Sequence, residues 1–238
     1  MSKRGKKYLA AAEKIDAEKQ YTPEEAISLT KETSFVNFDA TVEVHMRMGL
    51  DPRQAEEQIR DVVLLPHGLG KEVRVLVFAQ GDAARAAREA GADVIADDDD
   101  TVKKIQDGWL DFDVVIATQE SMGTVGQLGR VLGPRGLMPN PKTGTEVAAE
   151  DLPRAIEEAK AGRVEFRLDK TANLHVPIGK VSFEDKQLYD NLAALMEAIK
   201  KSRPASAKGA YIRRLVVCST MGPSVKIDPM QAQDMELN

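Results

Sequence analysis

The fold is decided by three short apolar runs in the middle of the chain: VRVLVFA at residues 73–79, ADVIA at 92–96 and FDVVIA at 112–117. Alanine-rich or amphipathic stretches at residues 83–90, 101–108 and 123–132 follow them, and these stretches have the periodicity of helices. Strands that alternate with helices form a parallel sheet, because each connection must cross the sheet. We therefore expect a Rossmann-like three-layer α/β unit, closed by a helix at residues 152–161 that ends at Gly162.

The sequence on either side of this block has another pattern. In residues 41–48 apolar side chains alternate with polar ones, so one strand face is expected to enter a core and the other to show Thr41, Glu43, His45 and Arg47. Residues 164–169 and 174–176 alternate in the same way. An apolar strand is also expected at residues 62–65, and another at 215–218, where Cys218 is expected to be a small buried hydrophobe.

Helix-start signals accompany these strands. Residues 22–25 read Thr-Pro-Glu-Glu, a capping box with proline at the first helical position. Asp51 and Pro52 predict a second helix to about residue 60, and residues 182–185 predict the start of a last helix with an apolar stripe over 188–199. The two ends of the chain therefore share one pattern, alternating strands together with capped helices, which is typical of an α+β domain.

These patterns predict a protein of α/β and α+β class with two domains. Residues 1–67 and 161–238 are expected to form a discontinuous α+β domain, and residues 68–160 an inserted Rossmann-like domain. Glycines mark both crossings, at residues 66–70 and at Gly162, so we expect a hinge.

The charge is unevenly distributed. The chain has 238 residues and a net charge of −5, which taken alone argues against a nucleic-acid partner. Residues 68–159 hold 10 Lys and Arg against 17 Asp and Glu, whereas the rest holds 23 against 21. The acidity thus belongs to the expected inserted domain. A single cysteine allows no internal disulfide, and with no apolar stretch of signal or membrane length we expect a cytoplasmic protein that no membrane holds.

A loop of sequence STMGPS, residues 219–224, follows the last apolar strand. Its hydroxyls can donate and accept hydrogen bonds, Gly222 allows close approach of another backbone, and Met221 offers a pliable apolar surface. The loop is therefore a candidate ligand contact. The alternative interpretation is a simple hairpin turn between two strands.

Two further motifs have both a functional and a structural interpretation. Residues 126–144 are rich in glycine and proline with Arg130, Arg135 and Lys142, but they lack the spacing of phosphate-binding loops, which favours a rigid structured loop. The four aspartates 97–100 offer cation ligands, yet such a run is typical of a solvated turn, here with Asp100 as the cap of the next helix.

Neither catalysis nor a cofactor is indicated. The three histidines are far apart in sequence, no cysteine pairs accompany them, and no nucleophile or metalloprotease motif occurs. We expect neither an enzyme nor a bound metal or cofactor. The chain also has few aromatic residues, so a stacking platform for single-stranded RNA is not indicated.

Five segments together carry a specific resemblance: FDATVEVH at residues 38–45, LPHG at 65–68, DGW at 107–109, LGPRGLMPNPK at 132–142 and TMGPS at 220–224. They resemble the bacterial L-one family of large-subunit ribosomal stalk proteins. The resemblance implies a split RNA-binding domain with an inserted Rossmann-like domain, in a protein that is a monomer when free. It further implies binding to the large-subunit rRNA stalk, release of deacylated exit-site tRNA, and repression by binding of its own operon mRNA.

The same resemblance implies an RNA contact surface. By position in the motifs, its members are Phe38, Thr41, Arg167, Lys170, Thr171, His175, Ser219, Thr220, Met221 and Gly222. Phe166 also corresponds to this surface, but its place in the alternation favours a core role. Two other functions stay open from the residues themselves: a nucleotide-dependent enzyme using the central unit, and a scaffold that binds only proteins.

Overall fold

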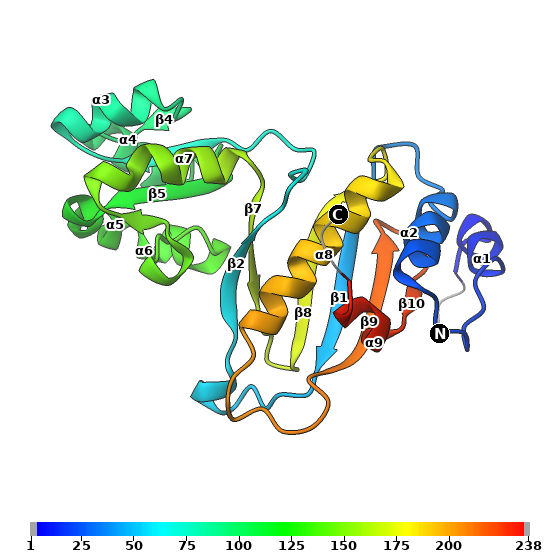
Figure 1. Ribbon diagram of the computed structural model, residues 1–238. Coiled ribbons are helices and arrows are strands. Elements are labelled where there is room, and N and C mark those ends of the chain that lie inside the picture. Colours follow the sequence, from blue (N-terminus) through cyan, green and yellow to red (C-terminus); the bar gives the residue numbers. More distant parts are fainter. Residues whose placement is uncertain (1–3, 236–238) are drawn as a thin grey trace. The chain divides into compact units, whose positions relative to one another are not determined.

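The computed structural model describes residues 4–235, apart from the side chain of Asp99. The chain divides into two compact units (Figure 1). Unit 2 is Lys71–Arg163, and unit 1 combines the described residues of Met1–Gly70 and Val164–Asn238. Both units mix helices with strands, so the mixed α/β character expected from the sequence is confirmed.

Unit 1 is built on a four-stranded sheet with the order β10-β9-β1-β8, in which every neighbouring pair is antiparallel. Its strands are β1 (Thr41–Met48), β8 (Asn173–Lys180), β9 (Ile212–Ser219) and β10 (Val225–Ile227). The alternation predicted for β1 is present, because Val42, Val44, Met46 and Met48 are buried while the residues between them are not. The two central strands, β1 and β9, come from opposite ends of the sequence (Figure 1).

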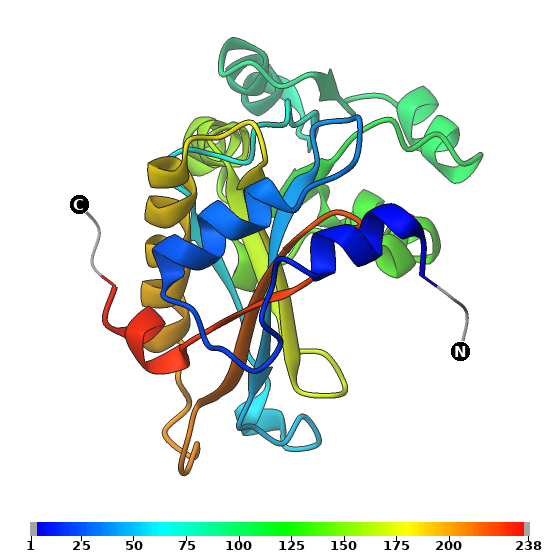
Figure 2. The ribbon, with the colours of Figure 1, turned by 90° about the vertical axis from the view of Figure 1, so that its right-hand side faces the viewer.

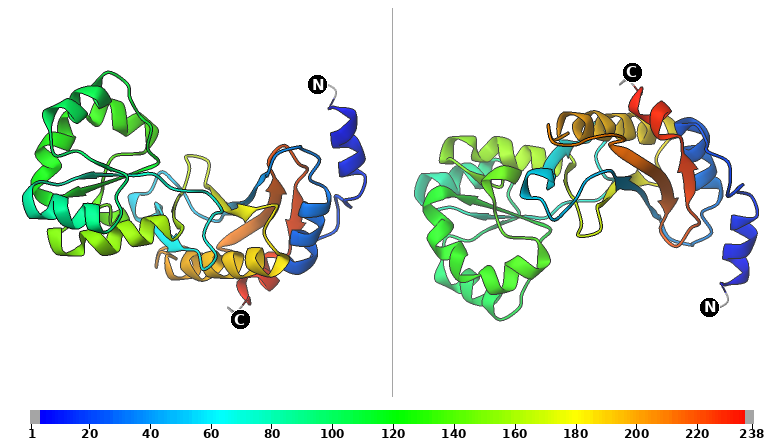
Figure 3. Two further views of the ribbon diagram at one scale, coloured as in Figure 1. Left: turned by 90° about the horizontal axis from the view of Figure 1, so that it is seen from above. Right: turned by 90° about the horizontal axis from the view of Figure 1, so that it is seen from below.

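Helices cover one face of this sheet. The helices α2 (Pro23–Glu32), α8 (Asp185–Lys201) and α9 (Pro229–Gln233) contact its strands, and α8 runs along one side of it in Figures 2 and 3. The apolar stripe predicted for the last helix is buried from Leu188 to Ile199. A short helix, α1 (Lys6–Ala12), precedes them, and its Tyr8 ring meets Phe35 edge-on at 6.4 Å between centroids.

The predicted helix starts have mixed outcomes. Thr22 and Glu25 form the expected capping box of α2, and α8 begins one residue after Glu184, within the predicted signal. The helix predicted from Asp51 to about residue 60 is wrong, since only a 3-10 turn forms at Ala55–Glu57. There the carboxylate of Glu57 accepts a hydrogen bond from the Asp51 N–H at 2.6 Å, which closes a local turn, and the following residues enter a strand.

That strand, β2 (Arg60–Leu64), pairs with β7 (Arg163–Arg167) in a separate two-stranded sheet. The segment after β2 is fixed to α8 by Asn191, which is fully buried. Its side-chain oxygen accepts from the His67 N–H at 3.0 Å, and its amide donates to the Gly68 carbonyl at 3.0 Å. Gly70 follows with φ +66°, and a side chain there would meet the Phe183 ring at 2.6 Å, so glycine is required.

Unit 2 has the parallel sheet that the apolar runs predict. Its order is β4-β3-β5-β6, with strands β3 (Val75–Phe78), β4 (Val94–Ile95), β5 (Val114–Thr118) and β6 (Glu146–Val147). Val75, Val77 and Ile116 pack with the helices α3 (Gly81–Glu89) and α7 (Leu152–Lys160). Leu76, Phe78 and Val115 form the cluster on the other face, with α4 (Asp99–Gln106), α5 (Met122–Gln127) and α6 (Gly129–Leu132). The unit therefore has three layers.

Three details of unit 2 differ from, or decide between, the sequence interpretations. The cap of α4 is Asp98, whose carboxylate accepts from the Thr101 N–H at 2.9 Å, so the assignment to Asp100 is wrong by two residues. The helix expected at residues 123–132 is broken at Leu128. Before β6, residues 133–147 form 3-10 turns at Gly133–Arg135 and Pro141–Thr143. The backbone carbonyl of Asn140 accepts a hydrogen bond from the Thr145 N–H, so this segment is a structured loop, as one of the two interpretations expects. One further 3-10 turn precedes α5 (Gln119–Ser121) and one precedes α7 (Ala149–Asp151).

Candidate nucleic-acid interface

The loop after β9 is joined to the start of β1 by paired hydrogen bonds. The Thr220 N–H donates to the Thr41 carbonyl at 2.9 Å, and the Thr41 N–H donates to the Thr220 hydroxyl oxygen at 3.1 Å. Lys180 on β8 donates to the Thr41 hydroxyl at 2.9 Å. Three strands therefore fix the same point. The loop also connects two antiparallel strands, so it is a hairpin turn as well as a candidate contact.

Backbone conformation and exposure single out Met221 within this loop. Its φ is +66°, a conformation that costs free energy for any residue with a Cβ atom. Its side chain is 70% exposed, which leaves a large apolar group in water. A strained backbone and an exposed apolar side chain at one residue make Met221 a candidate contact residue.

The residues around Met221 hold it in place. The Gly222 N–H donates to the Ser219 carbonyl at 2.8 Å, and a Cβ at Gly222 would collide with the Ser219 hydroxyl. Ser219 itself is buried, and its hydroxyl has no hydrogen-bond partner among the described residues. Ser219 and Gly222 thus shape the loop, whereas Met221 presents the exposed surface.

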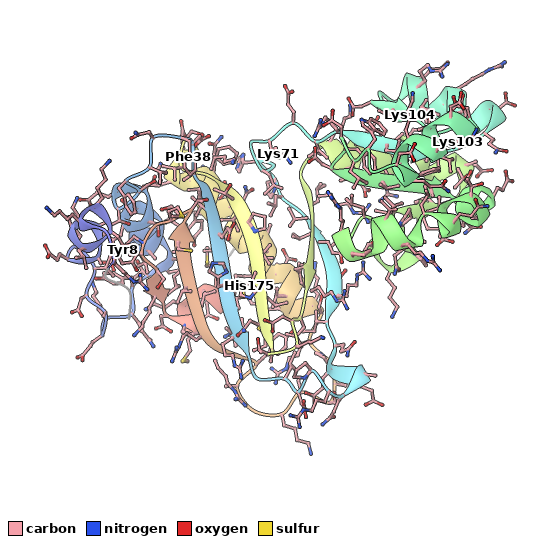
Figure 4. The ribbon with its side chains drawn as sticks, turned by 180° about the vertical axis from the view of Figure 1, so that it is seen from behind. Tyr8, Phe38, Lys71, Lys103, Lys104 and His175 are labelled. Atoms are coloured by element: carbon pink, nitrogen blue, oxygen red, sulfur yellow. The ribbon has the colours of Figure 1, made fainter. Side chains whose placement is uncertain are left out.

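Phe38 is the other large apolar side chain exposed near this end of β1. Its side chain is 58% exposed, three residues before Thr41 (Figure 4). An exposed ring and an exposed thioether, next to hydroxyl and ammonium groups, can bind a ligand with both apolar and anionic parts.

A second group of predicted residues lies at the other end of β1. Arg167 ends β7, while Lys170 and Thr171 are exposed in the connection to β8. The Asp169 carboxylate organises this connection by accepting from the N–H groups of Thr171 and Asn173 at 2.8 and 2.7 Å. Burial by itself would raise the pKa of Asp169, but these hydrogen bonds outweigh it and hold the pKa well below its ordinary value.

Between the two groups, His175 on β8 faces His45 on β1 (Figure 4), and their Nδ1 atoms are 2.8 Å apart. Burial and then the charge of His175 lower the pKa of His45, against the opposing effect of Glu43.

The His45 Nε2 atom lies 3.2 Å from the Cys218 thiol. Cys218 is only partly buried, on the sheet face opposite the core, so the prediction of a buried hydrophobe is wrong. Burial and Glu43 raise its pKa, which keeps the thiol protonated at neutral pH.

The structure thus places most of the predicted residues on the four-stranded sheet or at its ends, but not in one cluster, and Arg167 ends β7 in the separate two-stranded sheet. Phe38, Thr41 and the loop lie where β1 begins, and Thr171 lies where it ends, because β1 and β8 are antiparallel. In Figure 4 this face has His175 at its middle, and no helix of the described part of unit 1 lies in front of it. The sequence analysis missed three basic residues of unit 1, which are Lys180, Arg213 and Arg214. It correctly favoured a core role for Phe166, which is 1% exposed.

Other chemistries find no support within the described part of the chain. Among residues 4–235, no group of three or more His, Cys, Asp or Glu side chains is arranged to hold a metal ion. In the same range, no helix combines the length and the apolar character that a bilayer crossing requires.

An uncovered polar sheet face that ends in an exposed, strained loop is a candidate binding surface. Comparison with known proteins identifies the family. Residues 30–223 match the ribosomal protein L1p/L10e family, and the chain belongs to that family. It is 58% identical over 237 residues to "Large ribosomal subunit protein uL1" of Chloroflexus aggregans, covering 100% of both chains. It is 57% identical over 236 residues to the protein of that name in two strains of Chloroflexus aurantiacus, covering 99% of this chain and 100% of each relative.

This membership confirms the resemblance seen in the five sequence segments. The chain is a structural protein of the large ribosomal subunit and not an enzyme, which removes the nucleotide-dependent enzyme from consideration. Its predicted place on cytoplasmic ribosomes is confirmed by the same relatives.

Proposed function

We propose that this ribosomal protein binds the stalk region of large-subunit rRNA through the uncovered sheet face of unit 1 and the loop at Met221. The observation that carries the proposal is the coupling of Thr41 to Thr220, which presents an exposed Met221 in a left-handed conformation. A loop held this firmly loses little conformational entropy on binding, because its backbone is already ordered.

The chemistry of the face suits RNA. Exposed Met221 and Phe38 can lie against ribose or base faces, while hydroxyl and backbone groups meet the 2′-OH and phosphate oxygens. Arg167, at the end of β7, and Lys170, in the connection from β7 to β8, add exposed positive charge. Such contacts read the shape of a folded RNA more than its sequence.

In this proposal residues 1–67 and 161–238 act as a discontinuous RNA-binding domain, and residues 68–160 act as an inserted domain. The proposal includes two finer roles that family membership supports: release of deacylated tRNA from the exit site, and repression by binding of the protein's own operon mRNA. Both RNAs are expected to meet the protein as a monomer when it is free.

The test is binding of the full-length protein to an isolated stalk rRNA fragment. Met221→Asp places a charge where RNA approaches and is expected to weaken binding roughly tenfold to a hundredfold. Met230→Asp is the matched control, because Met230 is 75% exposed in α9 and lies outside the proposed face. Equal losses in both variants, or equal affinity for unrelated hairpins, would contradict the proposal. An RNA from the protein's own operon leader should compete with the stalk fragment for the same site.

A further inference from the structure

The uncovered face of unit 1 contains a hollow of about 520 Å³ at the end of β1 that is distant from the Met221 loop. Strands β1, β8 and β9 form its walls, and the polar side chains in them are Arg47, Asn173, Arg213, Arg214, His45 and His175. Three of these six side chains are guanidinium groups. The hollow is therefore a concentrated positive site on a protein whose net charge is −5.

An irregularity in β9 creates this concentration. Arg47 pairs with Arg214 and Met48 pairs with Ile212, so Arg213 is an extra residue without a partner on β1. Two residues of a bulged strand then oppose one residue of its neighbour. Ile212 and Leu215 are both buried, and Arg213 and Arg214 between them are both exposed. A regular strand would send one of the two arginines towards the core, whereas the bulge leaves both outside.

Within the described part of the chain these arginines form no ion pair, and Arg213 also borders a second hollow that Asp51 and Glu57 line. Arg47 donates to the Thr171 carbonyl and to the Asn173 side-chain oxygen, both of which are uncharged. Among residues 4–235, Arg213 and Arg214 make no ion pair with a carboxylate and no side-chain hydrogen bond. Neighbouring like charges repel, so the hollow is a site that an anion would stabilise.

Geometry connects the hollow to the proposed RNA contact. Arg214 lies on β9, and Thr220 directly follows this strand. The two residues are six positions apart, which corresponds to about 20 Å of extended chain. A ligand that reaches both ends must be about 20 Å long and carry an anionic group at the arginine end. A single guanidinium group matches two oxygens of a phosphate group through two parallel hydrogen bonds.

We propose that Arg47, Arg213 and Arg214 bind a backbone phosphate of the RNA whose ribose and base surfaces contact the Met221 loop. This inference rests on the proposed function and adds a second contact to it. The phosphate contact fixes the register of the RNA along the sheet and carries no sequence information. It is made by residues outside the RNA surface that the family resemblance implies.

The test compares salt dependence in the full-length protein, with the stalk rRNA fragment as the probe. The double variant Arg213→Gln/Arg214→Gln is expected to weaken binding about tenfold or more. It is also expected to reduce the slope of log affinity against log salt by about 0.7 to 0.9 for each phosphate that the variant no longer neutralises. Arg213→Lys/Arg214→Lys keeps the charge, and it should retain the slope with a smaller decrease in affinity.

Two controls separate this inference from the proposed function. Arg85→Gln/Arg88→Gln removes the same charge from α3 in unit 2 and should leave both affinity and slope unchanged. Met221→Gly should lower affinity without changing the slope, because it removes an uncharged contact. If the unchanged protein binds the RNA but Arg213→Gln/Arg214→Gln keeps its affinity and slope, the hollow is not a phosphate site. If the unchanged protein binds no RNA and instead binds an acidic peptide through these arginines, both RNA proposals are overturned.

Discussion

His45 and His175 face each other across β1 and β8 with their Nδ1 atoms 2.8 Å apart. At this distance one nitrogen must donate a proton and the other accept it, so the hydrogen bond breaks when both rings carry a full set of protons. Burial and the charge of His175 accordingly lower the pKa of His45. The pair lies in the middle of the proposed RNA face, and its protonation should be measurable in the free protein.

Stability should fall as the pH drops through the range where His45 gains a proton. The unfolded histidine has a pKa near 6.5, and the folded pKa is lower, so the unfolded chain binds more protons between the two values. The stabilisation is present above about pH 6.5 and is lost as the pH falls towards the folded pKa. Urea midpoints between about pH 5 and pH 8 would show this slope.

The slope should be smaller in His45→Asn, which removes the titrating ring. In His175→Gln the burial of His45 persists but the neighbouring charge is absent, so an intermediate slope is expected. Identical pH profiles for the unchanged protein and His45→Asn would show that the pair has no part in acid sensitivity.

Met221→Gly should separate stability from binding. Glycine adopts positive φ without strain but gains freedom in the unfolded chain, so the free energy of unfolding should stay the same or rise by up to about 1 kcal/mol. RNA affinity should nevertheless fall, because the exposed thioether side chain is absent. Chemical denaturation and RNA titration of one preparation would check both. A parallel loss of stability would indicate that Met221 supports the fold and is not a contact residue.

Gly222→Ala should distort the loop, because the added Cβ collides with the Ser219 hydroxyl. We expect a loss of about 1 to 3 kcal/mol in stability, together with weaker RNA binding. Ser219→Ala removes a buried hydroxyl that has no partner among the described residues, so by itself it should cost little. The double variant should recover part of the stability, and a double-mutant cycle measures that coupling. If the stability losses of the two single variants are strictly additive, the added Cβ collides with the backbone and not with the Ser219 hydroxyl.

The cap of α4 can be tested by a matched pair of aspartates. Asp98→Ala removes the acceptor of the Thr101 N–H and should cost about 0.5 to 2 kcal/mol. Asp100→Ala removes only an exposed contact of 3.7 Å with Lys103, and it should change stability by less than about 0.5 kcal/mol. Thermal denaturation of the two variants distinguishes them, and the reverse order would restore Asp100 as the cap.

Much of the fold follows from local sequence patterns. The alternation in β1 and the box at Thr22 and Glu25 depend on residues within one element, so they are visible without tertiary information. Asp51 gives the same kind of signal as Thr22, but there the Glu57 carboxylate takes the Asp51 N–H and closes a turn. In a run of four aspartates the sequence does not indicate which one caps, because each offers the same acceptor.

The site was less predictable, for a physical reason. The motif indicates the residues of the Met221 loop, but the bulge at Arg213 depends on pairing with β1, which lies far away in sequence. One sequence signal does indicate the bulge. Ile212 and Leu215 are apolar and three positions apart, whereas residues on the same face of a regular strand are two positions apart. The hinge expected at the glycine-marked crossings stays a prediction.

The hydrogen bonds between Thr41 and Thr220 join residues 179 positions apart, and this separation sets a delay during synthesis. At about 5 to 20 residues per second, a ribosome needs roughly 10 to 40 s to make the second threonine after the first. The strand β1 is therefore made before the whole of unit 2, and its partner β9 is made only afterwards. A growing chain therefore lacks the loop that we propose as an RNA contact until Thr220 has been made.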